Sequence, residues 1–147
     1  MDAKEYLSQI IDLEKEVRSR KAEISILKRS LGQLSSPSFG ERLIQQNAGD
    51  ASHVRKLNRI WQREEELKSS EAILGRLKDE AEEIISELED PNERAVLLGR
   101  YLEQMTFKQL AERFFITRAT ACKWAQRAEA KLIIPETSIN LEKSNTI

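Results

Sequence analysis

The sequence feature that most constrains the fold is a seam of apolar residues along the first part of the chain. Between positions 2 and 34, apolar side chains recur every three or four residues, at Ala3, Tyr6, Ile10, Leu13, Val17, Ile24, Leu27, Leu31 and Leu34. Arg20 is the one polar interruption. This heptad spacing predicts a helix of roughly 45 Å. Because so narrow an apolar stripe cannot stabilise a long helix alone, the helix needs a partner.

A second long helix is expected from about Asp50, a favourable N-cap residue, to Leu88. Glycine, serine and proline between positions 32 and 49 predict a loop before it. The two helices can pair in a hairpin within one chain or in a coiled coil between chains, and the pattern is compatible with both. The second apolar seam consists of Ile60, Leu67, Leu74, Ala81 and Leu88, flanked by Leu57, Leu77 and Ile84.

Three further helix starts follow. Positions 90–93 supply an N-cap acid, a proline at the first helical position and Glu93 as a capping-box partner. Thr106 with Gln109 marks a second start, and Thr117 marks a third, whose helix is expected to end before a proline at position 135. The predicted class is therefore all-α. The expected organisation is a hairpin or coiled-coil oligomerisation region at 1–89, a trihelical module at 90–134 and a disordered polar tail at 135–147.

Charge is distributed unevenly along the chain. Charged residues make up 33% of the sequence, aromatic residues only 5%, and the formal net charge is −1. Positions 77–90 carry seven acids and one lysine, whereas positions 106–132 carry six basic and two acidic residues, a local charge of +4. This asymmetry favours an anionic partner for the C-terminal module.

The last two helices of this module are spaced as in a helix-turn-helix. A small residue at Ala111 permits a close crossing of the two helices, and the apolar groups that follow set the crossing angle. Phe115 occupies a turn position that is often glycine. The residues expected on the inner faces and around the turn are Leu110, Ala111, Phe114, Ile116, Ala121 and Trp124.

The opposite face of the last helix carries the chemistry that DNA requires. Arginine and lysine can donate to guanine or to phosphate, glutamine can pair with adenine, and threonine or alanine can meet a thymine methyl group. The competing interpretation is a packing unit whose basic face is merely solvated. The candidate DNA-binding residues are Thr117, Arg118, Ala119, Thr120, Cys122, Lys123, Gln126 and Arg127.

The stretch LEDPNERAVLLGRYLEQMTFKQLAERFFITRATACKWAQRAEAKL resembles region four of bacterial sigma factors, and more closely the phage regulators of the ArpU/RinA type. MDAKEYLSQIIDLEKEV and the linker after it are also similar to phage and prophage proteins of this layout. The resemblance implies a transcription regulator of phage or prophage genes with its recognition helix at Thr117–Lys131, and contact with RNA polymerase. The small DNA-recognition subunit of a packaging terminase and a coiled-coil adaptor for polymerase remain alternatives.

Other function classes find little support in the sequence. There is no Walker loop, dinucleotide-binding turn or catalytic triad spacing, so neither an enzyme nor a cofactor is expected. His53 stands apart from any metal-ligand cluster, and Trp61 and Tyr101 are expected to fill apolar seams. A lone Cys122, no membrane-length apolar run and no signal peptide predict a cytoplasmic protein of the bacterial host cell, with double-stranded DNA and a homo-oligomer through residues 2–88 as partners.

Overall fold

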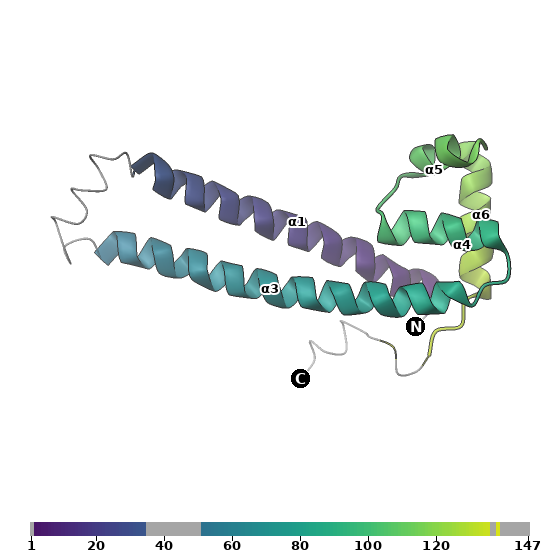
Figure 1. Cartoon of the computed structure of the whole chain (residues 1–147), viewed down its shortest axis with the longest axis horizontal. Coiled ribbons are helices and arrows are strands. Elements are labelled where there is room, and N and C mark those ends of the chain that lie inside the picture. The colour runs from purple at the N-terminus through teal and green to yellow at the C-terminus, as the bar shows by residue number, and fades with distance from the viewer. Residues whose placement is uncertain (1, 35–50, 136–137, 139–147) are drawn as a thin grey trace. The chain divides into compact units, whose positions relative to one another are not determined.

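The computed structural model describes residues 2–34, 51–135 and 138, and within these ranges the chain contains helices and no strand. The two long helices are α1 (Ala3–Leu34) and α3 (Ala51–Ser86) (Figure 1). Four shorter segments follow: α4 (Pro91–Leu97), the π-helical turn η2 (Leu98–Leu102), α5 (Phe107–Phe114) and α6 (Arg118–Lys131). The expected all-α class is confirmed.

The chain divides into two compact units, and each long helix contributes to both. The unit Lys15–Ala72 consists of the later part of α1 and the earlier part of α3. These segments run antiparallel, since Arg20 pairs with Glu66 at 2.9 Å while Lys28, further along α1, pairs with the earlier Glu64 at 2.6 Å. Pairing of the two helices within one chain is the arrangement that the structure adopts.

Arg20, the polar interruption of the first seam, has a local explanation. Its guanidinium donates hydrogen bonds to Glu16, one turn earlier on α1, and to Glu66 on α3. The side chain is only half-buried, so the charge stays partly hydrated. The interruption therefore links the two helices through a charge-assisted contact where an apolar contact is missing.

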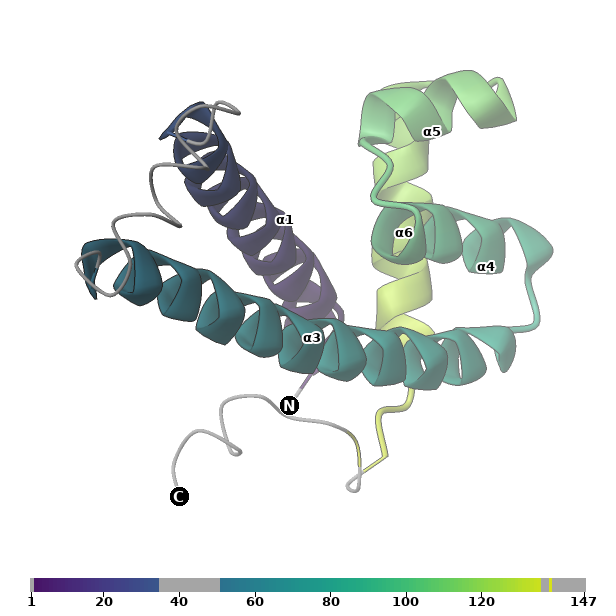
Figure 2. The ribbon, with the colours of Figure 1, turned by 60° about the vertical axis from the view of Figure 1, so that its left-hand side comes forward.

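The second unit combines residues 1–14 with residues 73–147. Here the start of α1 packs against the end of α3, and the Tyr6 hydroxyl donates to Glu80 at 2.5 Å. Burial, reinforced by this carboxylate, raises the pKa of the Tyr6 phenol far above its usual value. Figure 2 shows α4, α5 and α6 of the same unit, in which α6 contacts both α4 and α5. The fully buried apolar side chains of this unit include Tyr6, Leu7, Ile10, Leu77, Ala81, Ile85, Val96, Leu97, Leu110 and Ala121.

Several details differ from the sequence-based expectations. Trp61 is 63% exposed and Leu57 is also exposed, so neither fills the seam of α3. Leu7 and Ile85, outside the expected heptad positions, are fully buried in the unit that combines residues 1–14 with residues 73–147. The first helix ends at Leu34, the last residue of the expected seam, and so includes the first three positions of the expected loop 32–49. The rest of that loop and nearly all of the tail lie outside the described residues.

None of the helices that the structure describes combines the length and the apolar character needed to cross a membrane.

Candidate nucleic-acid interface

The N-cap residue Thr117 determines where α6 begins. Thr117 has extended backbone angles, and its hydroxyl accepts a hydrogen bond from the Thr120 amide at 3.1 Å. The two threonine hydroxyls also lie 2.8 Å apart. This is the start that the sequence predicts, because a threonine side chain satisfies one of the free amides of a first helical turn.

One face of α6 is formed by small residues and is buried. Ala121, Ala125 and Ala128 are at most 2% exposed, and α6 contacts α4 and α5. Alanine side chains allow the helices to approach closely without a cavity. The expectation that Trp124 shares this inner face is wrong in part, since Trp124 is only half-buried. The recurrence of alanine at positions 121, 125 and 128 was the signal that the sequence-based prediction missed.

The residues predicted to contact DNA lie on the remaining surface of α6 and at its N-terminal end. Thr120 and Cys122 are half-buried at its margin. The exposed members of the set are Thr117, Arg118, Ala119, Lys123, Gln126 and Arg127. The structure thus brings all eight predicted residues to one helix and its N-cap. By helical spacing, Ala119, Lys123, Gln126 and Arg127 lie opposite the buried alanines, whereas Thr117 and Arg118 lie at the N-terminal end on the same side as Ala121.

Three exposed cations of α6 have no acidic partner among the described residues. Arg118, Lys123 and Arg127 form no ion pair with any residue in the described part of the chain. Two other cations of the basic stretch are paired: Arg113 with Glu103 at 2.8 Å and Lys131 with Glu93 at 2.9 Å. The sixth cation, Lys108 on α5, is exposed and also forms no ion pair with a described residue, so three of the four cations available to an anionic ligand lie on α6.

The single acid of α6 is directed away from this charge. Glu129 is half-buried and accepts a hydrogen bond from the Tyr101 hydroxyl at 2.6 Å. Burial of the Tyr101 ring, with the hydrogen bond to Glu129 as the next contribution, raises the pKa of this phenol well above its usual value. Tyr101 is buried, so the prediction that it fills an apolar seam is confirmed.

The expected capping box at the start of α4 does not form. Asp90 caps the helix, since its side chain accepts from the Asn92 amide at 2.9 Å. Glu93, however, is 4% exposed and binds the Lys131 ammonium through both carboxylate oxygens, at 2.9 and 3.1 Å. Tertiary pairing with α6 thus replaces the local contact. It also removes Lys131 from the set of cations available to phosphate.

The turn between α5 and α6 is built around Phe115. Its backbone lies in the left-handed region, at φ 55° and ψ 44°, and its amide donates to the Ala111 carbonyl. The next amide, of Ile116, donates to the same carbonyl at 3.0 Å. Both hydrogen bonds are accepted by a carbonyl in the last turn of α5, which would otherwise lack a helical partner. The Phe115 side chain is 94% exposed.

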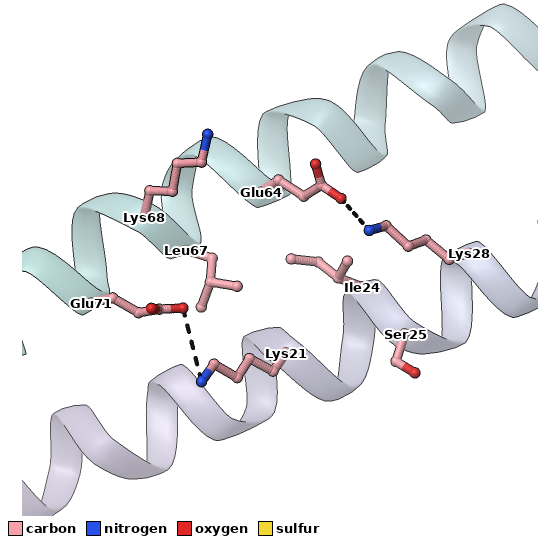
Figure 3. Close-up of a pocket in the computed structure, with 8 residues that line it drawn as sticks. All are labelled: Lys21, Ile24, Ser25, Lys28, Glu64, Leu67, Lys68 and Glu71. Atoms are coloured by element: carbon pink, nitrogen blue, oxygen red, sulfur yellow. Dashed lines mark ion pairs between the residues drawn. The ribbon is translucent and has the colours of Figure 1, made fainter.

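The other unit contains a hollow of about 530 Å³ between α1 and α3. In Figure 3, Ile24 and Leu67 face one another between α1 and α3, and ion pairs Lys21–Glu71 and Lys28–Glu64 bridge the helices on either side. Its polar groups are thus largely satisfied by one another. Among the described residues there is also no cluster of histidine, cysteine or acidic side chains that could hold a metal ion.

Comparison with known families gives one match. A sequence model of the family described as "Protein of unknown function (DUF1492)" matches residues 33–133, from the end of α1 to just beyond α6. No curated protein and no solved structure matches the chain.

Proposed function

The chain belongs to the DUF1492 family of proteins of unknown function, and we propose that it is a DNA-binding regulator that reads duplex DNA with the exposed face of α6. In this proposal α5 and α6 form a helix-turn-helix, and α6 is the recognition helix that enters the major groove. The protein acts as a homo-oligomer through residues 2–88. The sequence resemblance to ArpU/RinA-type regulators supports a role in transcription of phage or prophage genes, with RNA polymerase as a further partner.

The observation that carries the proposal is the exposed surface of α6, on which Arg118, Lys123 and Arg127 form no ion pair with any described residue. A solvated surface usually mixes charges of both signs, whereas here the one acid of the helix is turned toward Tyr101. Arg118, Lys123 and Arg127 provide donors for guanine and phosphate, and Gln126 provides the donor and acceptor pair that matches adenine.

The geometry of the turn supports the same proposal. The two helices contact one another, and only Phe115, Ile116 and the N-cap Thr117 separate them. Leu110 and Ala121 are fully buried, and Ala111 is nearly so, which fits a close crossing with no bulky group between the helices. A crossing of this kind holds one face of the second helix outward as a rigid surface.

The experiment that tests the proposal is a fluorescence-anisotropy titration of the full chain with random-sequence and selected DNA duplexes at two salt concentrations. We expect the logarithm of the binding constant to fall linearly with the logarithm of the salt concentration. Replacement of Arg127 by alanine should weaken binding to all duplexes and reduce the salt slope by about 0.9. Arg118→Ala or Gln126→Ala should instead reduce the preference for the selected duplex.

The matched control is Arg76→Ala, which removes an exposed arginine of α3 in the same unit. It changes the net charge equally and should leave the affinity and the salt slope close to those of the unmodified chain. Equal weakening by Arg76→Ala and Arg127→Ala would show that the chain's overall charge, not the α6 face, drives binding. No binding by the intact chain at low salt would overturn the proposal and favour the polymerase adaptor. Preference for a packaging-site duplex would favour the terminase subunit.

A further inference from the structure

Phe115 combines two features that do not stabilise the fold. Its backbone is left-handed, which is costly for a residue with a Cβ atom and is normally adopted by glycine or asparagine. Its ring is also 94% exposed, the highest value among the large apolar side chains of the described residues. The ring therefore gains almost nothing from burial within the chain. Glycine or asparagine would satisfy the same turn without strain or exposed apolar surface.

Phe115 lies just before the N-terminal end of α6. It is two residues before the N-cap Thr117, so the two Cα atoms are at most about 7 Å apart. Thr117 and Arg118, which follow it, are exposed and polar. Ile133, the other highly exposed large apolar residue among the described residues of this unit, follows the far end of α6, a helix about 20 Å long. Phe115 is thus an exposed apolar group next to the polar N-terminal end of α6.

This setting distinguishes between two kinds of ligand. A protein-binding site normally has a cluster of apolar anchors around its centre. An isolated aromatic ring near arginine and threonine side chains suits a surface that is mostly polar and anionic but carries single apolar groups. The major groove of DNA is such a surface, because the only apolar group on its base edges is the C5-methyl of thymine.

We propose that the Phe115 ring contacts a thymine C5-methyl group at the edge of the site read by α6, and so acts as a specificity-determining residue. This inference rests on the proposed DNA-binding function. The strained turn holds the ring outward, and no rearrangement of the chain is required when the contact forms. The ring adds an apolar recognition element to a helix face otherwise composed of hydrogen-bonding groups and short side chains.

The test uses the full chain and the duplex it selects from a random-sequence pool, with each thymine replaced in turn by deoxyuridine, which lacks only the methyl group. We expect one replacement that weakens binding of the unmodified chain about fourfold, from the loss of one buried methyl group. Phe115→Asn should bind the thymine and deoxyuridine duplexes equally at that position. Positions read by Ala119 or Thr120 should keep their deoxyuridine effect in this variant.

Two controls keep the result interpretable. Asparagine tolerates the left-handed region, so Phe115→Asn should melt at the same temperature as the unmodified chain or higher. Among the described residues, Gln104 is the other one that is left-handed and not glycine; it precedes α5, and Gln104→Asn should keep the full deoxyuridine effect. If Phe115→Asn retains that effect at every position while the unmodified chain binds DNA, the inference is wrong and the proposed function stands. If the unmodified chain selects no duplex, the proposed function itself fails.

Discussion

At the scale of single residues, two similar sequence patterns lead to different structures. Thr106 and Gln109 form a complete capping box, in which the threonine hydroxyl accepts from the Gln109 amide and the Gln109 side chain accepts from the Thr106 amide. Asp90 caps its helix as well, but Glu93 turns to Lys131. A carboxylate that is being buried is stabilised more by a cation than by one backbone amide. The nearest cation for Glu93 comes from α6, 38 residues later.

The Glu93–Lys131 pair leads to a stability prediction. Lys131→Met keeps the apolar stem but leaves a buried carboxylate without its cation. We therefore expect the free energy of unfolding, measured by urea titration, to fall by roughly 1–3 kcal/mol. Adding Glu93→Gln should recover part of this loss, because a neutral amide is less costly to bury than a carboxylate. Arg127→Ala, at an exposed position of the same helix, should change stability by less than about 0.5 kcal/mol. An unchanged urea midpoint for Lys131→Met would show that the pair does not stabilise the fold.

At the scale of elements, the helix whose start is predicted at positions 90–93 changes its hydrogen bonding after Leu97. The π-helical turn η2 follows α4 directly, and the Glu103 amide donates to the Leu98 carbonyl, five residues earlier, at 3.3 Å. Arg100 then donates to the Met105 carbonyl and lies over the Phe107 ring, 4.7 Å from its centroid. These contacts connect η2 to the start of α5, and no local sequence signal predicts them.

Gly99, within η2, allows α5 to approach. A Cβ atom there would lie 2.8 Å from Leu110 Cδ2 and 3.2 Å from Met105 Sδ, and Leu110 is fully buried. Gly99→Ala should therefore lower stability by roughly 1–3 kcal/mol through overpacking. Gly75 on α3 is the matched control, since a Cβ there meets nothing within 4 Å. Gly75→Ala should raise stability by about 0.5–1 kcal/mol. Thermal unfolding of both variants measures the difference in their stabilities. An increase in the stability of Gly99→Ala would contradict the close approach of α5 to Gly99.

At the scale of the whole molecule, the long helices bury only part of their apolar surface in the described part of the chain. The unit Lys15–Ala72 buries Ile24 and Ile60, but it leaves Val54, Leu57 and Trp61 of α3 exposed. Their spacing of three and four residues places them on one face of the helix. This face is where the proposed homo-oligomer would form its contacts, because paired helices otherwise expose few side chains of this size.

We therefore expect sedimentation velocity to show an oligomer for the full chain and a monomer for the double variant Leu57→Glu/Trp61→Glu. Two carboxylates on this face would have to be desolvated for the chains to associate. Ile133→Glu, which adds a charge at an exposed apolar residue of the other unit, should leave the oligomer intact. Monomeric behaviour of the unmodified chain at micromolar concentration would argue against oligomerisation through this region.

The sequence by itself determined the helical class, the approximate ends of the helices and the face of α6 that carries exposed polar groups. These follow from short-range physics: apolar periodicity, and caps at Asp90, Thr106 and Thr117 whose partners lie two or three residues away. Only the tertiary structure decided the partner of Glu93, the π-helical turn at Gly99, and the exposure of Trp61 and Phe115. The physical reason is that burial and ion pairing depend on segments that are distant in sequence, and on which surfaces remain after those segments have packed.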